Sequence, residues 1–285
     1  MYNIDSLPKD ILIEIAIELD LSDIVNWCQL NKRINSLTGQ NETFWMRKFI
    51  HDYGNNPKNS DLTWKEFYKL VTVTNPNDLL WKGVEENILS YVAIGLIRGA
   101  DIENTRSFNH HDYNPLSKAS ENGHLEVVKY LVEQGADVCA RYNYPLINAS
   151  DNGHLDVVKY LVEQGADVRA RDNYALRWAG YNGYLEVVKY LVEHGANVRA
   201  DNDFALRIAS ENGHLEVVKF LVKQGVNVRV EDDYALISAS ENGHLEVVKY
   251  LVEQGADVHA EYDYALRLAR HYEHFDIVDY LESLS

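Results

Sequence analysis

Apolar and charged positions alternate with helical spacing in a block that recurs along most of the chain. The stretch GHLEVVKYLVEQGADV begins at Gly123, and its apolar residues Val127, Val128 and Leu131 fall on one face of a helix with charged residues on the other. Gly135 follows the last apolar turn, where glycine readily takes the left-handed conformation that ends a helix. Nearly the same block returns every 30 residues, beginning at Gly153, Gly183, Gly213 and Gly243.

A shorter apolar stretch precedes each of these helices. Leu116, Ala119 and Ser120 predict a helix that stops before Asn122, so two antiparallel helices joined by a tight turn make up each unit. A fixed period of this length is typical of a stacked array, in which a unit buries its apolar face only against its neighbours. The expected fold class is therefore an all-α solenoid of short repeats.

The residues that open the first helix of each unit, followed by the Gly-His turn, resemble the ankyrin repeat. They read Asn114-Pro115-Leu116, Tyr144-Pro145-Leu146, Tyr174-Ala175-Leu176, Phe204-Ala205-Leu206, Tyr234-Ala235-Leu236 and Tyr264-Ala265-Leu266. The ankyrin family usually repeats at about 33 residues and has Thr-Pro-Leu-His at this position. Because Leu146 to Gly165 keeps the family's spacing, we expect the missing residues to come from the connectors, which should form only short fingers.

Residues 1–74 lack the repeated block, and their apolar spacing predicts a separate small helical module. The series Leu7, Pro8, Ile11, Leu12 and Ile15 resembles the start of an F-box, the helical motif that docks on the adaptor subunit of cullin-type ubiquitin ligases. The resemblance implies that these five residues contact such an adaptor. The alternative is a helical cap that covers the open end of the array, as terminal units of repeat proteins require.

The repeated block divides the remainder of the chain. We expect a divergent first repeat at 75–112, full repeats at 113–142, 143–172, 173–202, 203–232 and 233–262, and a capping repeat at 263–285. The connector from Asn104 to Tyr113 is longer than the others and contains His110 and His111. Since no second cluster at ligand spacing accompanies this pair, we expect a solvated loop and no metal site.

The charge and cysteine content narrow the classes of partner. The formal net charge of −17 argues against nucleic acid or an anionic membrane, because both are polyanions. No stretch approaches the roughly 18 apolar residues of a membrane span. Cys28 and Cys139 stand in different segments without metal-ligand spacing, so neither a disulfide framework nor a zinc site is expected, and a reducing cytoplasm fits best.

The recurring histidines are the strongest candidates for chemistry. His124, His154, His214 and His244 lie one or two repeats apart, and packed helices are about 8 to 10 Å apart, so they cannot converge on one ion. We expect them to have a structural role in the turn between helices. Without a phosphate-binding loop or a nucleophile elbow, neither an enzyme nor a cofactor is expected.

The variable connectors and first helices indicate the binding surface, because ankyrin proteins bind partners there. The residues that the resemblance assigns to it are Arg141, Arg171, Arg177, Trp178, Tyr181, Asp201, Arg207, Glu231, Asp232 and Glu261. Trp, Tyr and Arg are enriched at binding hot spots; alternatively, Trp178 fills space vacated at Gly180. We expect the aromatic residues that open the first helices to pack unit against unit. Acidity grows along the connectors, which predicts a basic partner toward the C-terminal fingers.

Together these features predict a protein–protein interaction adaptor. It is expected to be a monomer that holds a target protein on its repeats and recruits it to a host cullin-type ubiquitin ligase through residues 1–74. The alternative is a ubiquitin-independent binding module that sequesters a host or viral protein. The short, near-identical repeats resemble the ankyrin proteins of giant DNA viruses of amoebae, which implies a location in the host cytoplasm.

Overall fold

The computed structural model describes residues 44, 47, 48, 51, 63–108 and 111–284. The residues expected to contact a ligase adaptor lie outside these described residues: Leu7, Pro8, Ile11, Leu12 and Ile15. The chain divides into two compact units, residues 1–104 and 105–285, which are described one at a time. His110, one of the two histidines in the first connector, also lies outside the described residues.

The described part of the first unit contains a tightly packed helix pair. The helices of this part are α5 (Trp64–Val73), α6 (Pro76–Glu86) and α7 (Leu89–Ile97), and the pair consists of α6 and α7. Glycines allow α6 and α7 to approach closely, because a Cβ atom on Gly83 would lie 2.6 Å from the Val92 nitrogen and one on Gly95 would lie 2.9 Å from the Leu80 nitrogen. The indole of Trp81 is fully buried in this pair and donates a hydrogen bond of 3.0 Å to Asn104 Oδ1.

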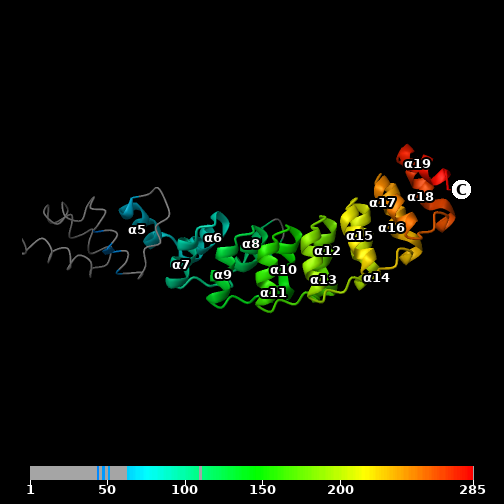
Figure 1. The fold of residues 1–285 in the computed structure, drawn as a ribbon. Helices are drawn as coiled ribbons and strands as arrows, with labels where there is room; N and C mark the ends of the chain where they lie inside the picture. The colour runs from blue at the N-terminus through cyan, green and yellow to red at the C-terminus, as the bar shows by residue number, and fades with distance from the viewer. Residues whose placement is uncertain (1–43, 45–46, 49–50, 52–62, 109–110, 285) are drawn as a thin grey trace, which may run out of the picture. The chain divides into compact units, whose positions relative to one another are not determined.

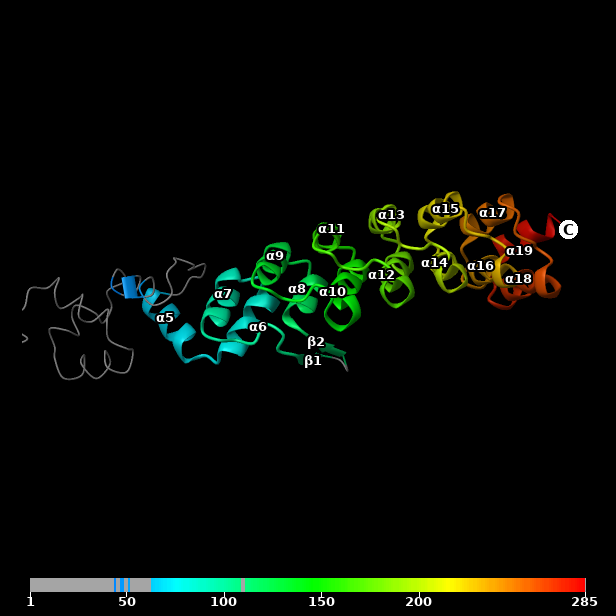
Figure 2. The ribbon, with the colours of Figure 1, turned by 90° about the horizontal axis from the view of Figure 1, so that it is seen from below.

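The second unit is a series of antiparallel helix pairs, as the periodicity predicts (Figure 1). Figure 2 shows that the first helices of the pairs form one layer and the second helices form the other. The first helices are α8 (Pro115–Glu121), α10 (Ala140–Asp151), α12 (Ala170–Tyr181), α14 (Ala200–Glu211), α16 (Val230–Glu241) and α18 (Ala260–His271). The second helices are α9 (Leu125–Glu133), α11 (Leu155–Glu163), α13 (Leu185–Glu193), α15 (Leu215–Lys223), α17 (Leu245–Glu253) and α19 (Phe275–Glu282).

Each second helix is amphipathic and ends at the predicted glycine. In α9, Val127, Val128 and Leu131 are fully buried, whereas Glu126 is exposed and pairs with Lys129 at 2.8 Å. Gly135 has a φ of 97°, which lets the Ala136 nitrogen donate back to the Leu131 oxygen at 3.0 Å. This bond satisfies a carbonyl that the helix itself leaves free.

The connectors differ between the first and the later repeats. The longer first connector forms a hairpin of β1 (Arg106–Phe108) and β2 (His111–Tyr113), paired antiparallel with Arg106 opposite Tyr113. The connectors that open α10, α12, α14, α16 and α18 are a left-handed turn in which three successive residues have φ between 49° and 65°. The short period therefore replaces the hairpin finger with a compact turn.

The left-handed turns are rich in asparagine and aspartate, which tolerate this conformation better than most residues. The third residue of the turns that open α10, α12, α14 and α16 also stabilises its own repeat through its side chain. Asn143 Oδ1 accepts a hydrogen bond of 2.8 Å from the Asp167 nitrogen, and Asn173 Oδ1 accepts one of 2.7 Å from the Asn197 nitrogen. Both asparagines are buried. The turn is thus held against the end of the second helix, and this bond offsets part of its backbone strain.

The recurring histidines link one repeat to the next. His154 Nε2 lies 2.9 Å from the carbonyl oxygen of Glu121, and His244 Nε2 lies 2.9 Å from that of Glu211. A carbonyl oxygen only accepts, so Nε2 carries the hydrogen. The ring also covers the turn glycine of the preceding repeat, where a Cβ atom on Gly213 would lie 2.5 Å from His244 Nδ1. These contacts support the structural role expected for the histidines.

We predict that two glycine substitutions separate backbone strain from this inter-repeat contact. Gly213 has a φ of 73° and lies under the His244 ring, whereas Gly255 has a φ of 94° and open space around it. Gly255→Ala should lower the free energy of unfolding by about 1 to 2 kcal/mol, the cost of a left-handed alanine. Gly213→Ala should cost about 1 to 3 kcal/mol more, because the histidine ring must also move.

Urea unfolding followed by circular dichroism measures both variants. His244→Ala in the Gly213→Ala background should recover part of the additional loss, because it removes the ring that the new methyl group meets. Equal losses for the two glycine variants would show that the ring does not constrain the turn.

Candidate functional site

Aromatic rings and guanidinium groups alternate along the exposed side of the first helices. The Arg171 guanidinium lies 5.3 Å from the ring centre of Tyr144 and 5.1 Å from that of Tyr174. Arg177 lies 4.8 Å from the Tyr174 ring and 4.0 Å from the Phe204 ring. At these distances a cation is attracted to the face of an aromatic ring. The rings expected to pack unit against unit are therefore separated by arginines, which leaves them partly exposed.

The same row continues toward the C-terminus. Arg207 lies 5.2 Å from the Phe204 ring and 5.4 Å from the Tyr234 ring. We call this series the arginine–aromatic row, made up of Tyr144, Arg171, Tyr174, Arg177, Phe204, Arg207 and Tyr234. Arg177 and Arg207 each follow an aromatic residue by three positions, a spacing that places both side chains on one helix face. This spacing can be read from the sequence, and it predicts contacts between each arginine and the aromatic ring that precedes it.

Ion pairs connect the arginine–aromatic row to the acidic connectors. Arg177 pairs with Asp201 at 3.1 Å, and Arg207 pairs with Glu231 at 2.8 Å. Both arginines are half-buried, whereas the carboxylates are exposed. Arginines of the first helices thus neutralise part of the charge that increases along the connectors. Fewer carboxylates are therefore free to attract a partner with a basic patch than the charge of the connectors alone indicates.

Trp178 stands between two hollows on this side of the repeats. Its indole packs edge to face against Tyr174, at 6.3 Å between ring centres, and against Tyr181, at 5.4 Å. The tyrosine hollow has a volume of about 320 Å³ and is lined by Tyr113, Tyr144, Ile147, Asn148, Asp151, Arg171, Tyr174 and Trp178. The apolar hollow, of about 180 Å³, is lined by Tyr174, Arg177, Trp178, Tyr181, Phe204 and Ile208.

Asp151 supplies the carboxylate of the tyrosine hollow. Asn182 Nδ2 donates to Asp151 Oδ1 at 2.8 Å and to the Asp151 carbonyl oxygen at 2.9 Å. Burial raises the pKa of the Asp151 carboxyl above its ordinary value, and the nearby Glu121 carboxylate raises this pKa further, whereas the Asn182 hydrogen bond lowers it. In the part of the chain that the structure describes, no lysine or arginine forms an ion pair with Asp151.

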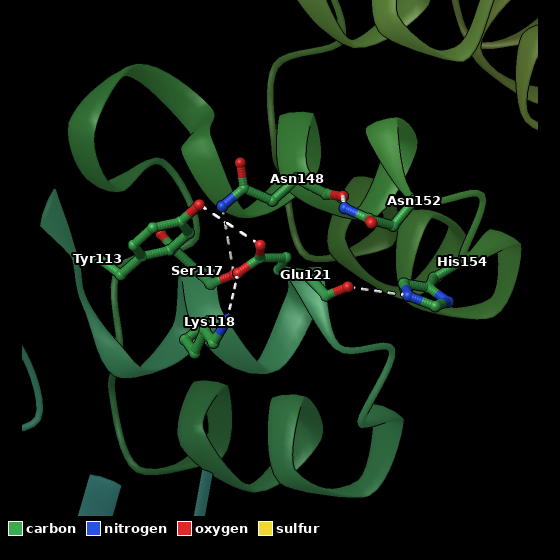
Figure 3. Close-up of polar contacts among 7 residues, drawn as sticks. All are labelled: Tyr113, Ser117, Lys118, Glu121, Asn148, Asn152 and His154. Carbon is green, nitrogen blue, oxygen red and sulfur yellow. Dashed lines mark hydrogen bonds and ion pairs between the residues drawn. The ribbon is translucent and has the colours of Figure 1, made fainter. Parts of the chain in front are cut away.

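Figure 3 shows the polar contacts beside this hollow. The Glu121 carboxylate forms an ion pair with Lys118 at 2.8 Å and accepts a hydrogen bond of 3.5 Å from the Tyr113 hydroxyl (Figure 3). The backbone carbonyl oxygen of Glu121 lies 2.9 Å from His154 Nε2. Asn148 Nδ2 donates to the Ser117 carbonyl oxygen at 3.4 Å. One carboxylate next to the hollow is therefore already paired with a cation, whereas that of Asp151 has only an amide partner.

The Asn182 contact exists because the unit that contains it lacks the usual histidine. His154 binds the carbonyl oxygen at the end of α8, and His214 binds that at the end of α12, at 2.8 Å. Tyr184 occupies the corresponding position between them, and its ring covers Gly153. The carbonyl oxygen of Asp151 at the end of α10 is bound by Asn182 instead, and the same amide holds the Asp151 carboxylate.

Comparison with known proteins establishes the family of this chain. The family model described as ankyrin repeats (3 copies) matches residues 84–172, 146–232, 176–262 and 206–283. The chain belongs to the ankyrin-repeat family. Ankyrin repeats are protein–protein interaction modules, which agrees with the protein–protein interaction function expected from the sequence. The F-box resemblance concerns residues that these matches do not include.

Two curated relatives and a solved structure agree with this assignment. Ankyrin repeat domain-containing protein 49 of Homo sapiens is 32% identical over 124 residues, covering 43% of this chain and 50% of that protein, and its Bos taurus counterpart matches equally. The ankyrin chain thus spans about half the length of the curated relatives it matches. The crystal structure of the human ASB11 ankyrin repeat domain superposes with a TM-score of 0.60 at 24% identity, covering 67% of this chain and 90% of that chain, a likeness of fold.

The structure brings together only some of the residues that the sequence assigned to partner binding in these ankyrin repeats. Arg171, Arg177, Trp178 and Tyr181 meet at α12, where Trp178 is 36% exposed and Tyr181 is 40% exposed. Arg207 lies on α14, and the remaining residues lie at the connectors. Arg141 donates to the Asp112 carbonyl oxygen at 2.7 Å, and Asp201 and Glu231 form ion pairs with arginines. Asp232 and Glu261 are exposed in left-handed turns.

The packing around Gly180 favours a surface position for Trp178. Gly180 is buried, and a Cβ atom there would meet the Ala205 oxygen of α14 at 3.5 Å. The rings next to Trp178 are those of Tyr174 and Tyr181 on its own helix. Trp178 therefore contacts ring edges on the exposed side of α12, and the residues that sequence reasoning overlooked are its neighbours in the tyrosine hollow, Tyr113 and Asp151.

Other classes of site receive no support from the described residues. Among residues 63–108 and 111–284, no group of three or more histidine, cysteine or acidic residues could hold a metal ion. No helix in these ranges is long and apolar enough to span a bilayer. Cys139 is a free, exposed thiol, and Cys28 lies outside the described residues.

We predict that Asp151→Asn makes the array more stable at neutral pH. The pKa of Asp151 is raised above 3.8 in the folded state, so folding favours the protonated form, and the unfolding free energy falls as the pH rises from below 3.8 through the folded-state pKa. Asparagine keeps an oxygen for Asn182 and carries no charge. The gain over the wild type should appear at about pH 7 and disappear near about pH 3. Glu163→Gln, an exposed change at the end of α11, is the control in urea unfolding at both pH values.

A second stability prediction concerns Trp178. Trp178→Ala should lower the unfolding free energy by about 1 to 2 kcal/mol, through two edge-to-face ring contacts and partly buried area. Leu176→Ala on the same helix should cost about 2 to 5 kcal/mol, because Leu176 is only 1% exposed. Denaturant midpoints compare the two variants, and a larger loss for Trp178→Ala would show that the tryptophan belongs to the core.

Proposed function

We propose that this ankyrin-repeat chain is a binding adaptor that holds a target protein on the first-helix face and recruits it to a cullin-type ubiquitin ligase through residues 1–74. One observation supports the target site above all: Trp178 and Tyr181 stay exposed beside two hollows on the face that ankyrin proteins use. Aromatic and arginine side chains in such hollows provide most of the binding energy at many interfaces.

The support for ligase recruitment is the order of residues in the first segment. Leu7, Pro8, Ile11, Leu12 and Ile15 match the start of the F-box motif, and this motif docks on the ligase adaptor. The second candidate function is sequestration of a host or viral protein without ubiquitin transfer, which requires only the target site. For either function we propose a cytoplasmic monomer, for which the free thiol of Cys139 is compatible support.

Two double variants separate the parts of this proposal. Leu7→Ala with Pro8→Ala should abolish co-elution of the purified adaptor subunit on a sizing column and leave the helicity of the repeats unchanged. Trp178→Ala with Tyr181→Ala should preserve adaptor co-elution and weaken target binding by about tenfold or more, as expected when two hot-spot residues are truncated. The target is first identified by affinity purification and then tested as a purified protein.

The two outcomes are read independently. If wild-type protein at micromolar concentration does not co-elute with the adaptor, ligase recruitment is wrong and sequestration becomes the leading function. If the target binds the Trp178 and Tyr181 variant as tightly as the wild type, the target site lies elsewhere on the repeats.

A further inference from the structure

We propose that the tyrosine hollow binds a cationic side chain of the partner protein, a lysine, methylated lysine or arginine, against its aromatic walls and the Asp151 carboxylate. This inference names the chemistry of one part of the target site and so rests on the proposed function. The opposite chemistry, an acidic or purely apolar side chain, is an outcome of the test below.

The walls of the hollow have the composition that binds cations. Residues 144, 147, 148 and 151 of α10, which recur at helical spacing, line the hollow together with residues 171, 174 and 178 of α12 and with Tyr113 of β2. Three tyrosines and one tryptophan thus surround a space of about 320 Å³. Aromatic faces attract ammonium and guanidinium groups, and more strongly where water is excluded.

The Asp151 carboxylate provides the negative charge in this hollow. It is half-buried, its only described polar partner is the Asn182 amide, and no described cation neutralises it. A partly desolvated carboxylate gains more from a cation than an exposed one does, because both its hydrogen-bonding capacity and its charge are satisfied. The whole chain carries a net charge of −17, which also favours approach by a cationic segment.

Arg171 shows how a cation fits there. Its guanidinium lies 5.3 Å and 5.1 Å from the rings of Tyr144 and Tyr174, yet Arg171 is exposed and forms no ion pair with any described residue. Its equivalent one repeat earlier, Arg141, is anchored to Asp112 by a hydrogen bond and an ion pair. Arg171 is therefore held mainly by the rings, and a partner cation that also reaches Asp151 can displace it into solvent.

The neighbouring apolar hollow extends this site. It is lined by residues of α12 and α14, among them Trp178, Phe204 and Ile208, and its lining is mainly apolar. Adjacent packed helices are about 8 to 10 Å apart, about the length of one three-residue turn of a polyproline II segment, in which residues three positions apart lie on the same side. The partner segment that fits both hollows has a cationic residue and an apolar residue about three positions apart.

The indole N–H of Trp178 reports directly on the tyrosine hollow. We would label the 285-residue chain with ¹⁵N-tryptophan, assign the Trp178 signal with Trp178→Phe, and titrate acetyl-lysine amide, acetyl-trimethyllysine amide and acetyl-arginine amide. The neutral control replaces the quaternary nitrogen of trimethyllysine with carbon. At least one cationic probe should give a saturable shift of the Trp178 signal, and the neutral control should bind about tenfold more weakly.

Two variants should change the affinity for the cationic probes in opposite directions. Asp151→Asn should weaken their binding by about tenfold, whereas Glu241→Gln, an equivalent position three repeats away, should leave it unchanged. Arg171→Ala should strengthen binding, because it removes the side chain that the probe displaces, and Arg141→Ala is its matched control. Thermal melts verify that each variant is folded.

The results distinguish this inference from the proposed function. Equal binding of the neutral control, absence of any saturable shift, or no gain for Arg171→Ala would overturn the cationic site. If the Trp178 and Tyr181 double variant still loses the target protein in that case, the target site stands and uses other chemistry. If the probes bind as expected but the double variant retains the target, the hollow binds cations and the proposed target site is wrong.

Discussion

Every helix pair from α8 onward buries its apolar residues against the adjacent pairs, and the turn between the two helices fixes that contact. The turn glycine has a positive φ, and the histidine ring of the next repeat lies where its side chain would be. The same ring binds the carbonyl oxygen that ends the preceding first helix. Where both residues are present, as in Gly123 with His154 and Gly213 with His244, one glycine and one histidine thus connect backbone conformation, helix termination and stacking, which explains why these two residues recur along the array.

The short repeat determines what the first-helix face can present. Without a hairpin in the later connectors, the chain enters each later first helix through a left-handed turn. In the turns before α10, α12, α14 and α16, the third residue is hydrogen-bonded to the backbone that follows the second helix. Carboxylates in the first position of the turn then lie within reach of arginines from the preceding first helix, as Asp201 does of Arg177 and Glu231 of Arg207. The resulting face combines aromatic rings, paired charges and few free carboxylates.

The candidate site forms where this regular pattern is interrupted. Tyr184 takes the place of a histidine, so Asn182 binds both the carbonyl oxygen and the carboxylate of Asp151. Trp178 projects from the same unit and separates the two hollows. In a repeat array whose other units are nearly identical, such a local departure distinguishes one surface from the rest, and recognition of a particular partner requires that distinction.

The sequence by itself determined the repeated architecture, because the apolar spacing, the helix-ending glycines and the fixed period are local properties of the chain. Val127, Val128 and Leu131 faced the core, and Gly135 ended its helix, where the pattern placed them. The sequence also indicated Trp178 and Tyr181 through their residue type. Only the tertiary structure decided that Tyr113, Asp151 and Arg171 share one hollow, since these residues come from three successive connectors and helices. It alone also showed that Asp201 and Glu231 are paired with arginines, because a charge count along the chain contains no information about neighbours across a repeat interface.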